Sequence, residues 1–117
     1  MSDRRREERL EVCLDAVWDG KSGNYIARVT DLSEGGCYLD SVGSVRLGEI
    51  VGFRVLLPDD DWLYLEGEVR HYGSGTGFGV KFIDLNDEQQ EKLQWLLKIA
   101  AEQGAESPSI QADLVEE

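Results

Sequence analysis

LEVCLDAVWDGKSGNYIARV, residues 10–29, is the stretch that decides the fold. From Leu10 to Trp18 apolar side chains occupy every second position, which is the spacing of a strand with one buried face. A second alternating run covers residues 24–30, after the turn-forming residues 19–23. The stretch therefore predicts a β-hairpin.

Four further strands are predicted beyond the hairpin, because short apolar runs alternate with turn-forming residues. They cover residues 37–40, 50–57, 62–72 and 78–83. Six short strands with frequent turn signals favour an antiparallel sandwich or barrel over repeated strand-helix-strand units.

One helix is predicted at the C-terminal side of the strands. Asn86 can cap it, with Gln89 three residues later completing a capping box. We expect the helix to end at about Gln103, before Gly104, and residues 104–117 to form a disordered acidic tail. Four apolar residues at helical spacing should lie on the barrel: Leu93, Leu96, Leu97 and Ala100.

Composition limits the classes of function. The chain has 117 residues, enough for one compact domain, and a net charge of -12, which argues against binding DNA or RNA. No apolar run approaches the roughly 18 residues that span a bilayer, so we expect a cytoplasmic protein without membrane insertion. Cys13 and Cys37 have no metal-ligand spacing and are expected to be reduced and structural.

Three features of the sequence do not support a catalytic, metal or phosphate-binding site. His71 is the only histidine and has no partner for a metal site or a nucleophilic triad. The acidic run 59–61 lacks the spaced ligands of a calcium loop and is expected to be a solvated turn. The glycine-rich run 73–79 precedes a strand rather than a helix, so a hairpin turn is expected there instead of a phosphate-binding loop.

Two motifs remain. Arg5 and Arg9 form an RxxxR just before the first strand, and Asp31, Ser33 and Gly36 form a DxSxxG between the second and third strands. Taken separately, each has an ordinary explanation, because terminal charge runs are usually solvated and Asp, Ser and Gly are common in turns.

Taken together, the two motifs and the late glycine-rich turn before residues 79–82 resemble the PilZ domain family over residues 4 to about 100. The resemblance implies an all-β fold with a C-terminal helix, namely a six-stranded antiparallel β-barrel over residues 10–103. It also implies that the ligand is cyclic di-GMP, that the chain is not an enzyme, and that it needs no metal or cofactor.

The resemblance implies a binding site in which arginines hold guanine edges and phosphates, because the guanidinium fork matches two adjacent acceptors. Asp31 would accept hydrogen bonds from guanine, Ser33 would bond phosphate or base, and Gly36 would leave room for the ligand. Glu7 and Glu8 depart from the family pattern of apolar residues between the motif arginines. The implied ligand-binding residues are Arg4, Arg5, Arg6, Arg9, Asp31, Ser33, Gly35 and Gly36.

The function implied is a monomeric receptor or adaptor whose mobile arm, residues 1–9, closes over cyclic di-GMP and signals to an unidentified downstream protein. Arg4, directly before the RxxxR, resembles family members that bind two stacked ligand molecules. Trp95 and Ile99 are expected to pack on the barrel, with a partner surface as the alternative. The rival functions are a degenerate PilZ interaction module that binds no nucleotide, an OB-like barrel that binds single-stranded nucleic acid, and an enzyme.

Overall fold

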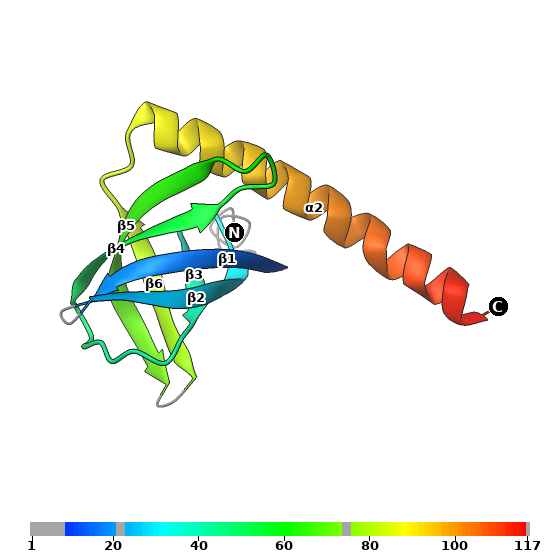
Figure 1. The fold of residues 1–117 in the computed structure, drawn as a ribbon. Helices are drawn as coiled ribbons and strands as arrows, with labels where there is room; N and C mark the ends of the chain where they lie inside the picture. Colours follow the sequence, from blue (N-terminus) through cyan, green and yellow to red (C-terminus); the bar gives the residue numbers. More distant parts are fainter. Residues whose placement is uncertain (1–8, 21–22, 74–75, 117) are drawn as a thin grey trace, which may run out of the picture.

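The computed structural model describes residues 9–20, 23–73 and 76–116, and within them six strands form one closed antiparallel barrel (Figure 1). Around the barrel the strands follow the order β1-β2-β3-β6-β5-β4. The strands are β1 (Leu10–Gly20), β2 (Gly23–Leu32), β3 (Gly36–Asp40), β4 (Ile50–Leu56), β5 (Trp62–Gly73) and β6 (Gly77–Ile83). A single helix follows them, α2 (Asp87–Glu116). The predicted six-stranded barrel with a C-terminal helix is confirmed.

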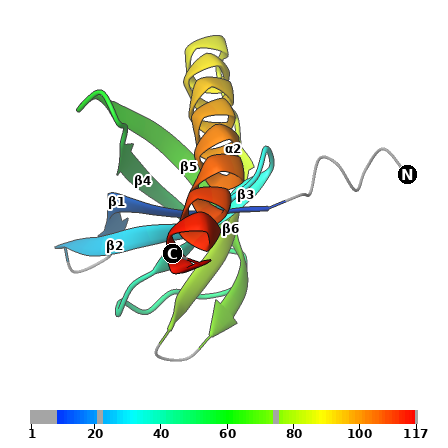
Figure 2. The ribbon, with the colours of Figure 1, turned by 90° about the vertical axis from the view of Figure 1, so that its right-hand side faces the viewer.

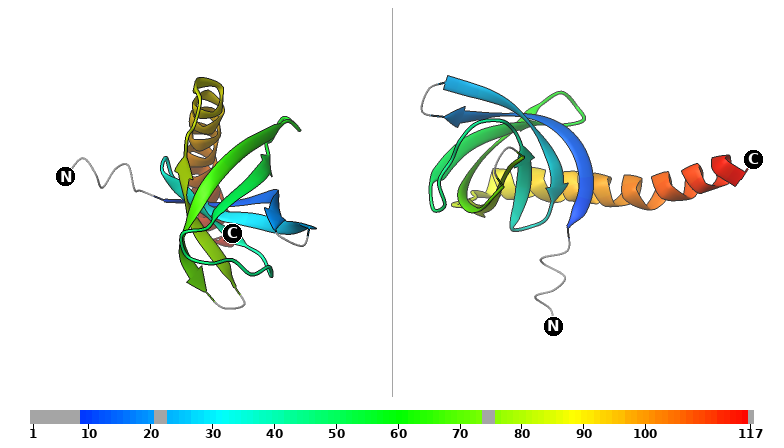
Figure 3. Two further views of the ribbon diagram at one scale, coloured as in Figure 1. Left: turned by 90° about the vertical axis from the view of Figure 1, so that its left-hand side faces the viewer. Right: turned by 90° about the horizontal axis from the view of Figure 1, so that it is seen from below.

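Two kinds of pairing build the barrel. Four pairings join strands that follow one another in sequence: β1 with β2, β2 with β3, β4 with β5, and β5 with β6. Closure then requires two pairings between strands distant in sequence, β1 with β4 and β3 with β6. Figure 3 shows the strands curving around a common interior. Because the circuit is complete, each strand is paired on both sides.

Trp18 is the largest side chain fully buried in the barrel. Its ring stacks on Tyr25 with centroids 4.6 Å apart and meets Phe78 edge-on at 5.1 Å. The indole Nε1 donates to Ser41 Oγ at 2.9 Å, and Ser41 Oγ donates in turn to the Ile26 carbonyl at 3.0 Å. The alternating apolar positions of β1 thus end on a buried indole whose N–H is satisfied.

The capping box predicted for α2 is present. Asn86 N donates to Gln89 Oε1 at 2.8 Å, and Gln89 N donates to Asn86 Oδ1 at 2.7 Å. Leu93, Leu96 and Ala100 are buried, and the helix packs against β1 and β5. The helix runs beside the barrel and then extends past it (Figures 1 and 2).

The helix is longer than its sequence indicated. We predicted an end at about Gln103, but α2 continues past Gly104 and Pro108 to Glu116. One glycine costs a helix only about 1 kcal/mol relative to alanine, and the alanines and glutamates around it are good helix formers. Glycine alone was therefore a poor stop signal, and disorder of residues 104–117 in solution stays a prediction. No helix in the described part of the chain is both long and apolar enough to cross a membrane.

Replacing Ser41 by alanine tests the buried hydrogen bond of Trp18. Ser41→Ala leaves the indole N–H without its acceptor, so the free energy of unfolding should fall by roughly 1 to 3 kcal/mol. Urea unfolding followed by tryptophan fluorescence measures this change. Ser44→Ala, at an exposed position of the same loop, is the matched control and should leave the midpoint unchanged. Equal midpoints for both variants would contradict the role given to Ser41.

Candidate functional site

The register of the β1–β2 pair brings the two sequence motifs together. Leu10, the first residue of β1, pairs with Leu32, so Arg9 lies beside the turn that follows β2. Arg9 Nη1 donates to Asp31 Oδ1, which joins the RxxxR to the DxSxxG by an ion pair. The two side chains are 50% and 33% exposed, so the pair lies at the surface.

The turn after Asp31 is held in shape by Ser33. Its hydroxyl donates to the Gly36 carbonyl at 3.2 Å and accepts from the Gly35 and Gly36 amides at 3.3 and 3.2 Å. The backbone adds a hydrogen bond from Ser33 N to the Gly36 carbonyl at 2.9 Å. Ser33 is buried, so its hydroxyl stabilises the turn from inside.

The two glycines of the turn have different surroundings. A Cβ on Gly36 would lie 2.1 Å from the Val80 carbonyl oxygen, because β3 approaches β6 closely there. A Cβ on Gly35 would meet nothing within 4 Å, and neither glycine has a positive φ. The contact between β3 and β6 thus requires a glycine at position 36, whether or not a ligand binds there. Neither a close contact nor the backbone conformation requires a glycine at position 35.

The turn forms one wall of an open groove of about 710 Å³. The opposite wall consists of Arg70, His71 and Lys81 from β5 and β6. Arg70 is the extra residue of a β-bulge, since Val69 pairs with Val80 and His71 pairs with Gly79. The bulge leaves both Arg70 and His71 exposed, whereas regular alternation would turn one of them inward.

Three of the residues that line the groove are glycines and project no side chain into it: Gly35, Gly36 and Gly79. Two arginines and one lysine surround it, and Glu34 is the only acidic residue among the described lining residues. The groove is therefore cationic within a chain of net charge -12. A cationic groove suits an anionic ligand.

The sequence predicted part of this site. Arg9, Ser33, Gly35 and Gly36 line the groove, and Asp31 adjoins it through Arg9. The predicted residues Arg4, Arg5 and Arg6 lie outside the described residues. The wall formed by Arg70, His71 and Lys81 was missed, because neither the bulge nor the β3–β6 pairing is visible in residue spacing.

Thiol and metal chemistry find no support in the described residues. Cys13 and Cys37 are both free. Burial, with a smaller contribution from the Asp31 carboxylate, raises the pKa of the Cys37 thiol well above its usual range, so the thiol stays protonated. Among the residues that could be searched, no group of three or more His, Cys, Asp or Glu side chains could hold a metal ion. What the site offers is hydrogen bonding and positive charge.

Comparison with known proteins identifies similar chains. Residues 3–98 match the PilZ domain family. The PilZ domain of YcgR from Escherichia coli, solved with c-di-GMP, superposes with a TM-score of 0.74 at 13% identity, covering 91% of this chain and 98% of that one. The PilZ domain of CeSA from a cellulose-synthesizing bacterium gives a TM-score of 0.63 at 21% identity, with coverages of 80% and 98%. At these identities, the structural similarity shows a shared fold.

A third similar structure is longer than this chain. The inhibitor of motility MotI/DgrA from Bacillus subtilis gives a TM-score of 0.66 at 18% identity over 77% of this chain, which spans 48% of that protein. No curated protein sequence is significantly similar to the chain.

The different surroundings of Gly35 and Gly36 lead to a test on the protein without ligand. Gly36→Ala places a methyl group against the Val80 carbonyl and should lower the free energy of unfolding by about 1 to 3 kcal/mol. Gly35→Ala should leave it within about 0.5 kcal/mol of the original. Urea unfolding of the two variants measures the difference. Similar losses in both would show that the close approach of β3 to β6 does not decide stability at this turn.

Proposed function

This chain belongs to the PilZ domain family, and from that premise we propose that it is a receptor for cyclic di-GMP. The family consists of cyclic di-GMP receptors, and its domain is a non-catalytic binding module. The solved domain of YcgR, which has the same fold, holds c-di-GMP. The proposed ligand is a cyclic dinucleotide with two guanines and two phosphates, and the proposed outcome is binding without turnover.

The observation that carries the proposal is the ion pair of Arg9 with Asp31 at the rim of the cationic groove. A guanine edge offers acceptors at O6 and N7 and donors at N1 and N2. The arginine fork can donate to the acceptors, and the Asp31 carboxylate can accept from the donors. The two motifs thus place complementary groups side by side.

Exchanging this ion pair for a ligand is energetically reasonable. An ion pair as exposed as Arg9 with Asp31 is worth at most about 1 kcal/mol, whereas one bidentate arginine contact with guanine is worth roughly 1 to 3 kcal/mol. The pair therefore preorients both side chains without competing strongly with the ligand.

The far wall of the groove supplies groups for the phosphates. Arg70 and Lys81 carry positive charge, and His71 adds hydrogen-bonding nitrogens. The volume of about 710 Å³ lies within the range of about 300 to 1,000 Å³ typical of ligand pockets. The open space at Gly35 lets the ligand approach the backbone of the turn. Ser33 contributes by holding that turn, and its direct contact with ligand stays a prediction.

The arm completes the proposed receptor. Arg4, Arg5 and Arg6 precede Arg9 by three to five residues, and a chain of that length is long enough to reach the groove. We propose that they close over the bound nucleotide and that a downstream protein reads the changed surface, in the cytoplasm.

Calorimetric titration of the full chain with cyclic di-GMP tests the proposal. Replacing Arg5, Arg9 or Asp31 by alanine removes a contact with guanine, so each variant should bind at least about tenfold more weakly. Arg70→Ala and Lys81→Ala should weaken binding more strongly at low salt than at high salt, because their contribution is electrostatic.

Arg28→Ala is the matched control, because Arg28 on β2 forms an ion pair with Asp15 on β1 and does not line the groove. It should bind as tightly as the original chain. Absence of heat with the unmodified chain would contradict the proposal and favour a PilZ-type interaction module that binds no nucleotide. Binding that survives every groove substitution would place the ligand elsewhere.

The number of ligands is a separate prediction. Two cyclic di-GMP molecules should bind each chain, because the Arg4 guanidinium can stack on the additional guanine and neutralise the additional phosphates. Arg4→Leu should reduce the calorimetric stoichiometry toward one while retaining measurable affinity. The titration is run at protein concentrations well above the dissociation constant. A stoichiometry of one for the unmodified chain would rule out the stacked pair.

A further inference from the structure

A row of partly apolar side chains crosses the outside of the barrel away from the groove. Val17 on β1 pairs with Ile26 on β2 and with Arg54 on β4, and Arg54 pairs with Tyr64 on β5. Paired residues on neighbouring strands point to the same face, so the four side chains follow one another across four strands. Ile26 is 83% exposed and Tyr64 is 60% exposed. This face, which we call the β1–β4 face, is uncovered in the described part of the chain.

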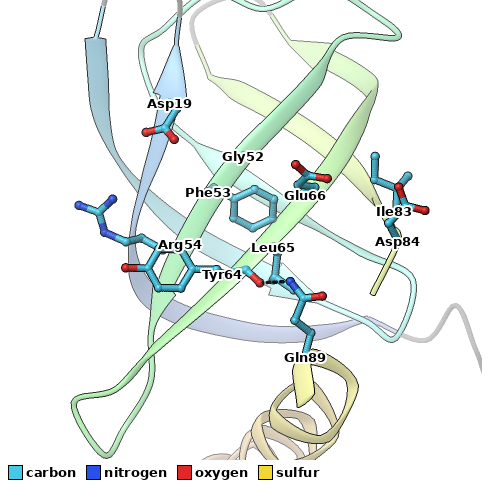
Figure 4. Close-up of a pocket in the computed structure, with 10 residues that line it drawn as sticks. All are labelled: Asp19, Gly52, Phe53, Arg54, Tyr64, Leu65, Glu66, Ile83, Asp84 and Gln89. Atoms are coloured by element: carbon cyan, nitrogen blue, oxygen red, sulfur yellow. Dashed lines mark hydrogen bonds between the residues drawn. The ribbon is translucent and has the colours of Figure 1, made fainter. Parts of the chain in front are cut away.

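A hollow of about 290 Å³ adjoins the row (Figure 4). It forms at Gly52, where the absence of a side chain leaves a gap between Asp19 on β1 and Glu66, the β5 partner of Gly52. The Tyr64 ring forms one side, and the other side ends at Asp84. Gln89 of α2 donates to the Tyr64 carbonyl at 2.6 Å, which fixes this strand against the start of the helix.

The hollow is negatively charged. Asp19, Glu66 and Asp84 line it, and none of them forms an ion pair with another described residue. Arg54, the one basic residue of the lining, instead has its guanidinium over the Trp62 ring at 5.1 Å from the centroid. The carboxylates therefore remain available to a cation from outside.

We propose that the β1–β4 face docks a partner protein through a segment that combines a basic side chain with apolar ones. The hollow takes the arginine or lysine, whose charge meets the carboxylates while its stem lies along the Tyr64 ring. The row from Ile26 to Tyr64 takes the apolar side chains. Charge complementarity selects this occupant, because the surrounding carboxylates repel an anion and the chain as a whole carries -12.

Size also separates this hollow from the groove. At about 290 Å³ the hollow has less than half the volume of the groove, which is about 710 Å³. Its residues are not shared with the groove, so this docking site does not depend on the proposed nucleotide binding.

The test uses the ¹⁵N-labelled full chain and matched acetylated pentapeptides. Arg-Leu-Arg-Leu-Arg should produce saturable shifts centred on the amides of Gly52, Tyr64 and Glu66. Arg-Ser-Arg-Ser-Arg should bind more weakly because it lacks apolar side chains, and Glu-Leu-Glu-Leu-Glu should not bind. The combined substitution Asp19→Asn with Glu66→Gln should weaken the first peptide at least about tenfold, as expected when charge-assisted hydrogen bonds are lost.

Asp59→Asn is the control, because Asp59 is an exposed carboxylate in the turn between β4 and β5 and does not line the hollow. It should leave peptide affinity unchanged. Calorimetry with cyclic di-GMP should give the same result for the Asp19/Glu66 variant as for the original chain, which separates failure of this site from failure of the receptor function. Shifts centred elsewhere, equal binding of the acidic peptide, or a dimer in solution that Tyr64→Ser dissociates would each overturn the proposal.

Discussion

The pairing of β3 with β6 is the constraint on which the rest of the structure depends. These strands are far apart in sequence, and their contact closes the barrel. At Gly36 the two backbones approach so closely that no side chain fits. Phe82 N also donates to the Gly35 carbonyl at 2.8 Å, so the turn is attached to β6 on one side while Leu32 attaches it to β1 on the other. Closure of the barrel and the geometry of the groove therefore have one cause.

Local charge matters more than net charge for the kind of partner this chain can bind. The net charge of -12 argues against a long polyanion, whose binding requires an extended basic surface. A small anion needs only a few basic groups, and the groove collects Arg9 from just before β1, Arg70 from the bulge in β5 and Lys81 from β6. The acidic residues excluded from the groove are spread over the other faces, including the hollow beside Gly52.

The fold could be predicted from the sequence because its strands are locally encoded. The alternating pattern of β1, the turn residues before β2 and the Asn86 capping box are each contained within a few residues, and each is present in the structure. The far wall of the groove could not be predicted in this way. Its exposed Arg70 and His71 depend on a bulge, which breaks the alternation that sequence analysis relies on. The end of α2 was misjudged because Gly104 was treated as sufficient to stop a helix.

The roles of the predicted site residues also depended on tertiary contacts. Sequence spacing marked Ser33 and Gly36 as part of a binding motif, but it could not show that the Ser33 hydroxyl bonds the turn or that Gly36 faces β6. Both residues fix the backbone of the turn, so their substitution should change the stability of the protein. Arg9 and Asp31 differ from them, because their ion pair is exposed and contributes little to folding.

The β5–β6 hairpin lines both the cationic groove and the acidic hollow. Lys81, which lines the groove, pairs with Glu68, and two residues further along the same ladder Ile83 pairs with Glu66 at the acidic hollow. The surface thus changes from basic to acidic over two residues of each strand. Opposite charges this close keep the two occupants apart, because an anionic nucleotide is repelled from the hollow and a basic protein segment is repelled from the groove. The proposed messenger and the proposed protein partner would therefore not compete for one site.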